Sequence, residues 1–305
     1  MPHYRSIDVI SLPACWLTIG VFDGVHRGHQ EILGRLITGA HASGVPAVVI
    51  TFDPHPARVL GNREIKLLTL PEERAELLLS SGVDVVITIP FDKDVAALSA
   101  QEFMQSVHRQ INIQRLLIGY DFALGRGREG NAVLLTEIGH NLGYALEVVG
   151  AVGDESGVIS SSAIRKLISI GDVVEANKLL GHPYNLSGPV IHGDGRGRKI
   201  NIPTANIQIS PEKILPANGV YACRAQIGTA THLAVTNIGV RPTFLPQNQS
   251  AGVETHILDF KRELYDEVIK LDFISRLRDE MKFPSVEALV EQIHRDIEQT
   301  RRILS

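Results

Sequence analysis

The chain has 305 residues, of which 44% are hydrophobic and 21% charged, and its formal net charge is −4. This length favours two domains, each able to bury a core. The small net charge argues against an extended nucleic-acid surface, and no apolar run approaches the ~18 residues of a membrane-spanning helix. Two cysteines, Cys15 and Cys223, allow neither a disulfide framework nor a cysteine metal cluster. We therefore expect a cytoplasmic protein without a signal peptide.

The first half of the chain alternates short apolar runs with amphipathic segments. Strands are expected at residues 15–19, 47–50, 83–89 and 116–118, and helices at 71–80 and 99–111. Ser99 and Glu102 form a capping-box signature, and Gly181 stands where the last helix of this half should end. This order predicts a parallel sheet covered by helices, an α/β domain over residues 1–183.

Residues 19–29 read as the end of a strand, a tight turn and the start of a helix. Gly24 can take backbone angles closed to other residues, while His26 and His29 fall on one face of the first helical turn. Free backbone N–H groups and the helix dipole attract phosphate there, and the two imidazoles could hold a triphosphate as pyrophosphate leaves. Two alternatives remain: a metal site, or one capping histidine beside one core histidine.

Three serines, Ser160, Ser161 and Ser162, stand before an amphipathic segment whose first turns carry Arg165 and Lys166. Cations near a helix N-terminus oppose its dipole, so a phosphate between them and the serines would relieve the conflict. The alternative is an ordinary serine-capped helix with solvated cations.

The pattern changes after residue 183 to short β-prone pieces at residues 219–223, 232–235 and 253–260. We expect a small barrel or sandwich over residues 184–305, closed by a helix that starts at Ser285. Its apolar stripe should belong to the core and comprises Val286, Leu289, Val290, Ile293 and Ile297.

Polar motifs of this second half suggest phosphate chemistry. This chemistry would not use a P-loop, because no Walker sequence occurs. Residues 193–199 form a glycine-rich loop with cations. Thr204 and Asn206, two apart on an extended segment, would present oxygens from one side, which suits magnesium bound together with ATP. In a strand, Glu254 shares a face with His256, and it is a candidate general base; the alternative is a solvent-facing carboxylate.

The segments GVFDGVHRGH (20–29), FDPHP (52–56) and ISSSAIRKLI (159–168) resemble the adenylyltransferase module of bacterial bifunctional riboflavin kinase/FAD synthetases, within the HxGH nucleotidylyltransferase superfamily. The resemblance implies a Rossmann-like domain in which His26 and His29 hold the ATP phosphates and Arg165 stabilises the departing pyrophosphate. It assigns to ATP also Gly20, Phe22, Asp23, Gly24, Ser160, Ser161 and Ser162, and to the flavin Phe52, Pro54, His55, Pro56 and Asp121. Leu124 stands where the family usually has an aromatic ring.

Five further segments resemble the riboflavin kinase module: GDGRGR, PTAN, ANGVYA, NIGVRPTF and VETHILDF. The resemblance implies a compact β-barrel in which Thr204 and Asn206 bind magnesium-ATP and Glu254 activates the ribityl 5′-hydroxyl. It assigns to the ATP phosphates Gly193, Gly195, Gly197 and Lys199, and to the flavin Asn237, Arg241 and Thr243.

Together these segments predict a bifunctional enzyme that phosphorylates riboflavin to FMN and then adenylylates FMN to FAD. Magnesium with ATP would be its cofactor, and the flavin its substrate and product; no nucleic-acid or membrane partner is expected, and no oligomeric state is indicated. Two alternatives stay open. A related nucleotidylyltransferase for another acceptor would not phosphorylate riboflavin, and a flavin-binding protein would bind flavin without turning over ATP.

Overall fold

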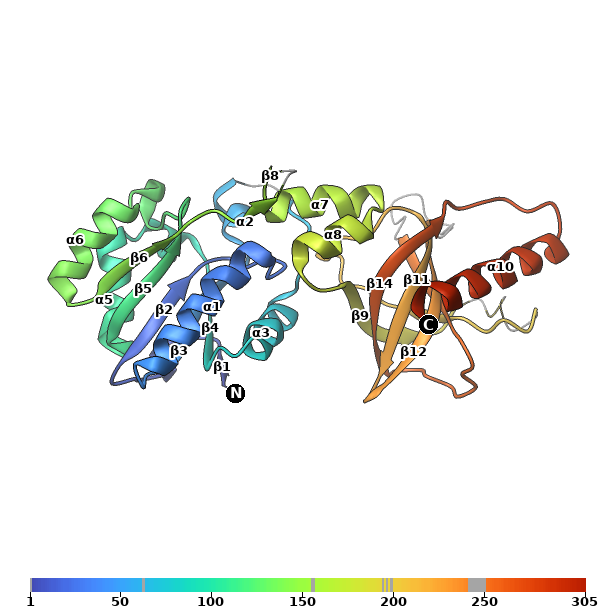
Figure 1. The fold of residues 1–305 in the computed structure, drawn as a ribbon, viewed down its shortest axis with the longest axis horizontal. Coiled ribbons are helices and arrows are strands. Elements are labelled where there is room, and N and C mark those ends of the chain that lie inside the picture. Colours follow the sequence, from blue (N-terminus) through green and yellow to red (C-terminus); the bar gives the residue numbers. More distant parts are fainter. Residues whose placement is uncertain are drawn as a thin grey trace. The chain divides into compact units, whose positions relative to one another are not determined.

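The computed structural model describes residues 2–61, 64–154, 157–193, 195, 197, 200–240 and 251–305. The chain divides into two compact units, Met1–Ser161 and Ser162–Ser305. Figure 1 shows a sheet flanked by helices in the first unit and a barrel with helices in the second. The expected domain boundary after residue 183 stays a prediction.

The first unit is built on a six-stranded sheet of order β1-β4-β3-β2-β5-β6, in which every neighbouring pair is parallel. Its strands are β1 (His3–Tyr4), β2 (Cys15–Ile19), β3 (Ala47–Asp53), β4 (Val85–Pro90), β5 (Ile113–Gly119) and β6 (Ala145–Val149). The chain moves outward from β2 in one direction through β3 and later in the other through β5. The carboxyl end of β2 is therefore the topological switch point, where open α/β sheets bind ligands.

Helices cover both faces of this sheet. They are α1 (Arg27–Ala42), α2 (Pro56–Gly61), α3 (Pro71–Ser80), α4 (Lys93–Ala97), α5 (Ala100–Ile111) and α6 (Ala132–Leu142), with short 3₁₀ turns at Ile7–Val9 and Arg126–Arg128 and a small ribbon of β7 (Gly153–Asp154) and β8 (Gly157–Val158). One face packs with α1 and α3, the other with α5 and α6, because alternate residues of β3 such as Val49 and Ile50 point to opposite sides. The expected capping box of Ser99 and Glu102 is present.

The second unit holds a closed antiparallel barrel of order β10-β13-β12-β11-β14-β9. Its strands are β9 (Tyr184–Ile191), β10 (Ala205–Ile207), β11 (Gly219–Ile227), β12 (Ala230–Val240), β13 (Ala251–Ile257) and β14 (Val268–Arg278). Along β13, Val253, Thr255 and Ile257 are buried, whereas Glu254 and His256 are only partly so. This alternation fits a barrel whose interior is filled by side chains. Because the sheet closes on itself, the barrel and not the sandwich is confirmed.

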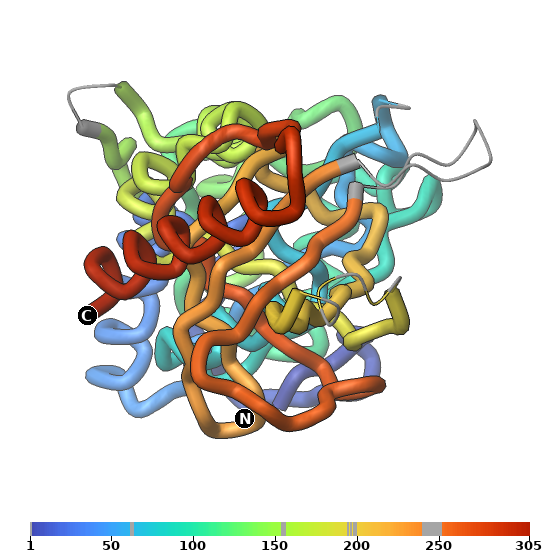
Figure 2. The backbone as a smooth tube through the Cα atoms, turned by 90° about the vertical axis from the view of Figure 1, so that its right-hand side faces the viewer, coloured from blue at the N-terminus to red at the C-terminus, as the bar shows by residue number. Residues whose placement is uncertain are grey.

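Among the described residues, three helices accompany the barrel: α7 (Ser161–Ile170), α8 (Val173–Leu180) and α10 (Val286–Leu304). Figure 2 shows α10 lying across the barrel, where it packs against β11 and β12. Its predicted core stripe is only partly correct. Ile297 packs on a buried cluster, but Val286 is 55% exposed, and the fully buried positions are Asp296, Thr300 and Leu304. Within the part of the chain that the structure describes, no helix is both long and apolar enough to cross a membrane.

Candidate functional site

The turn after β2 has an unusual backbone. Phe22, Gly24 and Val25 adopt left-handed φ angles of 51°, 83° and 41°. Such angles suit glycine but cost side-chain-bearing residues about 1–3 kcal/mol each, and they cluster at functional sites. Hydrogen bonds hold the turn: Val25 N donates to Phe22 O at 3.0 Å, and Gly24 N to Thr69 Oγ1 at 2.9 Å.

Asp23, which the family resemblance assigns to ATP, is buried beneath this turn and stabilises it by hydrogen bonds. Its carboxylate is 1% exposed and accepts hydrogen bonds from Leu68 N and from Thr69 N and Oγ1, at 2.9–3.1 Å. Its backbone oxygen accepts from Ser161 Oγ at 2.9 Å. The carboxylate therefore joins the turn to the start of α3, and the serine segment begins beside the turn.

The two histidines lie against each other at the start of α1. The rings of His26 and His29 are stacked, with centroids 3.6 Å apart and planes 17° apart. His26 is the N-cap residue but makes no side-chain capping hydrogen bond, so the capping interpretation fails. A Cβ on Gly28 would come within 3.1 Å of the His26 ring, which explains why glycine separates the histidines. Phe22 packs edge-on against His29 at 5.1 Å.

The surroundings of His29 hold its imidazole neutral. Burial, followed by the neighbouring His26 and Arg74, lowers the pKa of His29 well below its usual 6.5. Its Nδ1 is buried and has no hydrogen-bond partner among the described residues. A neutral imidazole offers one N–H donor without the desolvation cost of a full charge, which suits a phosphate oxygen.

Arg74 is a charged group of this site that the sequence interpretation missed. The side chain lies on α3, is 1% exposed, and donates from Nη2 to Phe52 O at 2.8 Å. Burial lowers the pKa of its guanidinium, while Asp23 and Asp53 oppose that shift. Its helix position could have indicated this, because Pro71, Arg74 and Leu78 share the apolar face at i, i+3 and i+7.

The predicted flavin segment follows β3. The Phe52 ring is buried against Phe91 and Phe103, at centroid distances of 5.4 and 6.3 Å. Pro54, which follows a cis peptide bond, is exposed. His55 Nδ1 accepts from Ala57 N at 3.1 Å, and Pro56 begins α2.

Beyond β5, the other predicted flavin residue, Asp121, is exposed, and its backbone oxygen accepts from Arg128 Nη2 at 3.0 Å. Leu124 packs against the core, whereas the Tyr120 ring is 53% exposed. The exposed aromatic surface of this segment therefore comes from Tyr120.

The predicted pyrophosphate residues lie around the start of α7. Ser160 precedes the helix, while Ser161 and Ser162 form its first turn, so two of the three hydroxyls lie within the helix and not before it. Arg165 follows on the second turn and is partly buried. Ser162 and Arg165 belong to the second compact unit, and their role stays a prediction.

In the barrel, three predicted residues lie in one row. Glu254 on β13 pairs with Asn206 on β10 and with Asn237 on β12. Paired residues of neighbouring strands have side chains on the same face, about 5 Å apart. The sequence neighbours of Glu254 are apolar, but its spatial neighbours are two asparagines, so its surroundings are more polar than the sequence suggested.

Two glycines from the glycine-rich segment lie close to Thr204 and Asn206. A Cβ on Gly193 would overlap the side-chain amide of Asn206, and one on Gly197 would come within 3.3 Å of Thr204 Oγ1. Gly195 has a left-handed φ of 66°. The close approach explains the glycines, because any side chain would push the loop away. Lys199, Arg241 and Thr243 lie outside the described residues.

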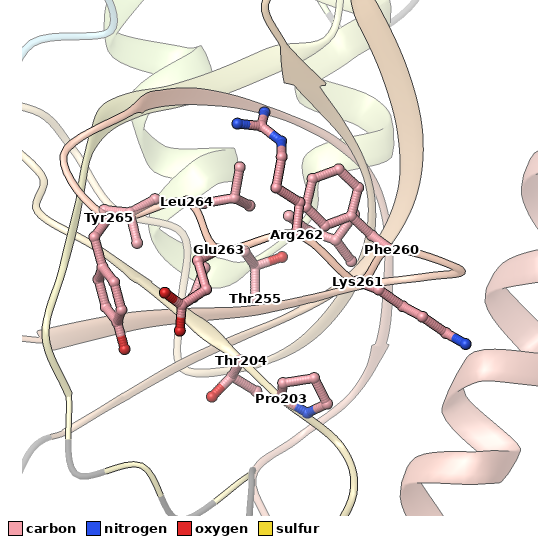
Figure 3. A pocket seen from close by; sticks show the side chains of 12 residues that line it. Pro203, Thr204, Thr255, Phe260, Lys261, Arg262, Glu263, Leu264 and Tyr265 are labelled. Carbon is pink, nitrogen blue, oxygen red and sulfur yellow. The ribbon is translucent and has the colours of Figure 1, made fainter.

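A pocket of about 250 Å³ opens beside Thr204. Figure 3 shows Thr204, Thr255 and the side chains of residues 260–265 around it, with Glu263 directed toward Tyr265 and Lys261 pointing away. The Tyr265 ring stacks on His192 with centroids 3.9 Å apart. The sequence interpretation missed Tyr265; the aromatic residues at either end of a charged run, Phe260 and Tyr265, were its available signal.

Comparisons with known proteins found matches for both parts of the chain. The model of the FAD synthetase family matches residues 10–163, and that of the riboflavin kinase family matches residues 180–304. The bifunctional riboflavin kinase/FMN adenylyltransferase of Listeria monocytogenes is 37% identical over 287 residues, covering 93% of this chain and 91% of the relative. That of Bacillus subtilis is 36% identical over 293 residues, covering 95% and 92%.

A crystal structure from Streptococcus pneumoniae, described as a macrolide-efflux protein, is similar with a TM-score of 0.90 and 33% identity, covering 98% of each chain. That description concerns the other protein and names a different activity from the curated relatives. The two family models and the curated relatives agree with each other over nearly the whole length. The chain belongs to the bifunctional riboflavin kinase/FMN adenylyltransferase family.

Proposed function

We propose that this chain phosphorylates riboflavin to FMN at its barrel and adenylylates FMN to FAD at its parallel-sheet domain, using one ATP for each step. The observation that carries this proposal is that one chain holds two separate clusters of residues of the kinds that bind phosphate. One is the stacked pair of His26 and His29 at a helix start. The other is the row of Asn206, Glu254 and Asn237 under a glycine-rich loop.

In the adenylyl transfer, a phosphate oxygen of FMN attacks the α-phosphorus of ATP, and the bond to pyrophosphate breaks. His26 and His29 donate hydrogen bonds to the ATP phosphates, and Ser160 and Ser161 of the same unit receive the leaving pyrophosphate. Groups fixed before the reaction stabilise developing charge without reorganisation. No covalent intermediate is needed.

In the kinase step, Glu254 accepts the proton of the ribityl 5′-hydroxyl as its oxygen attacks the γ-phosphorus of ATP and ADP leaves. The Thr204 hydroxyl and the Asn206 amide oxygen are ligands of the kind magnesium accepts, and both adjoin the glycine loop, so these residues fit a magnesium-ATP site. Bound magnesium would neutralise phosphate charge. The aromatic pocket beside Thr204 suits a planar ring of a substrate.

We also propose a cytoplasmic location. Cys15 and Cys223 are both buried free thiols, one in each compact unit. Burial raises the pKa of both thiols, that of Cys15 to about 12, which makes them unreactive packing groups. Unpaired thiols are usual in a reducing compartment.

The proposal is tested by incubating the purified protein with riboflavin, MgCl₂ and ATP and separating the flavins by chromatography over time. We expect FMN first and FAD later, and neither when EDTA replaces magnesium. FAD formed from added FMN, with riboflavin left unchanged, would indicate a lone adenylyltransferase. Tight flavin binding without any product would indicate a binding protein.

A further inference from the structure

The start of α3 connects the two predicted half-sites of the adenylyl transfer. On one side, the Asp23 carboxylate of the phosphate turn accepts from the backbone of Leu68 and Thr69. On the other side, Arg74 Nη2 donates to the carbonyl oxygen of Phe52 at 2.8 Å. Residues 68–74 are therefore bonded both to the turn that carries the histidines and to the segment predicted to bind flavin.

Burying the charge of Arg74 costs desolvation free energy, and packing alone does not require a charged residue at this position. The effective penalty for removing an ion from water is several kcal/mol, and a well-packed apolar residue of similar volume is often as stable. Arg74 is 1% exposed, and its Nε has no hydrogen-bond partner among the described residues. A cation kept under these conditions beside a reaction site points to a role in that site.

We propose that Arg74 is a positioning residue for the adenylyl transfer, fixing the Phe52 carbonyl and with it the flavin segment (residues 52–56) at a set place relative to the phosphate turn (residues 22–26). This inference rests on the proposed function. The attacking FMN oxygen must lie about 3–3.5 Å from the α-phosphorus in line with the leaving group, and a displacement of about 1 Å lowers the rate about 10²-fold.

The electrostatic surroundings support this assignment. Arg74 contributes to the lowered pKa of His29, after burial and His26, so the guanidinium lies within electrostatic reach of the ATP-side histidines. Asp23 and Asp53 in turn stabilise its charge. Through its charge, Arg74 therefore interacts with Asp23 of the phosphate turn and with Asp53 of the flavin segment. It also donates a hydrogen bond to Phe52.

The test compares Arg74→Met and Arg74→Lys in the full-length protein. Methionine fills a similar unbranched volume without donors or charge, and lysine keeps one donor group and the charge. We expect kcat/KM for FMN to fall about 10²-fold in Arg74→Met. Lysine should restore it to within about tenfold of wild type. KM for ATP should stay within about threefold in both, because the phosphate turn keeps its own bonds through Asp23.

Arg115→Met is the matched control. Arg115 also lies in the first unit, where it pairs with Glu147 at 3.2 Å and lies over the Trp16 ring at 4.6 Å, away from both half-sites. Its replacement should leave both KM values unchanged. Riboflavin phosphorylation should be unchanged in all three variants.

The outcomes separate the two proposals. If the wild type forms no FAD, the proposed function fails. Suppose instead that the wild type forms FAD. The positioning role is then wrong if the folded Arg74 variants keep the wild-type kinetic constants, if KM rises equally for FMN and ATP, or if Arg74→Lys is as impaired as Arg74→Met. If Arg74→Met does not fold, Arg74→Lys decides: a kcat/KM for FMN lowered about three- to tenfold with KM for ATP unchanged supports the role, and unchanged constants overturn it.

Discussion

His29 combines features that a phosphate donor requires. Its ring lies between His26 and Phe22, and its pKa is lowered chiefly by burial. At neutral pH the ring is uncharged, so a bound triphosphate meets oriented N–H donors, while the helix start adds backbone N–H groups. The same burial makes the stability of the protein depend on pH.

The free energy of unfolding should decrease as the pH falls below about 6.5. Above this pH, His29 is neutral in both states. Below it, the unfolded chain binds a proton that the folded site resists, so stability falls by at most about 1.4 kcal/mol per pH unit from this group. Urea unfolding of wild type and His29→Gln between about pH 5 and 7.5 checks this.

The pKa values of His3 and His108 are also lowered in the folded protein, and both residues remain in the variant. The difference between the two curves therefore isolates His29. Parallel curves would show that its burial is not coupled to stability.

At the scale of elements, two ion pairs among the described residues join α10 to other parts of the second unit, one buried and one exposed. Arg278 Nη2 contacts Asp296 Oδ2 at 2.8 Å, and the Asp296 side chain is 3% exposed. Arg301 Nη2 contacts Asp259 Oδ1 at 2.9 Å, but the Asp259 side chain is 73% exposed. Gln292 Nε2 also donates a hydrogen bond to Asp296 Oδ1 at 2.9 Å, so the first pair is part of a small buried network.

Asp296→Ala should lower the free energy of unfolding by about 3 kcal/mol, because it leaves Arg278 with its charge largely buried and unpaired. Asp259→Asn is the control and should leave stability unchanged, since asparagine tolerates the left-handed φ of 57° at this position and solvent screens the exposed pair. Chemical denaturation followed by circular dichroism measures both variants. Equal effects would mean that burial does not distinguish the two pairs.

At the scale of the molecule, the two histidines predicted for the adenylyl transfer and the carboxylate predicted for the kinase step lie in different compact units, whereas Arg165 falls just inside the second unit. His26 and His29 lie in Met1–Ser161, and Glu254 lies in Ser162–Ser305. The two reactions should therefore respond to different substitutions, although FMN is the product of one and the substrate of the other.

His29→Ala should lower FAD formation from FMN by about 10²-fold or more while FMN formation from riboflavin stays near wild type, because one preorganised donor is lost. Glu254→Gln should do the reverse. Initial rates of each reaction, measured separately by chromatography, provide the comparison. Equal damage to both activities in folded protein would contradict one reaction per unit.

Much of the fold follows from local sequence. Gly24 at a left-handed φ, the Ser99 capping box and the helix end at Gly181 were predictable, because steric limits and capping hydrogen bonds act within a few residues. The parallel sheet followed from strand and helix alternation. Motif positions of the candidate sites also followed from short segments of sequence.

Contacts between distant segments were decided only by the tertiary structure. Arg74 is buried because Phe52, 22 residues away, supplies its acceptor, and Glu254 lies between Asn206 and Asn237 because strand register placed them side by side. On α10 the apolar Val286 is exposed while the charged Asp296 is buried, because Asp296 meets Arg278 of β14. A sequence by itself determines which local structures are possible and which groups are present. Their surroundings depend on which segments meet, and that is settled only when the whole chain packs.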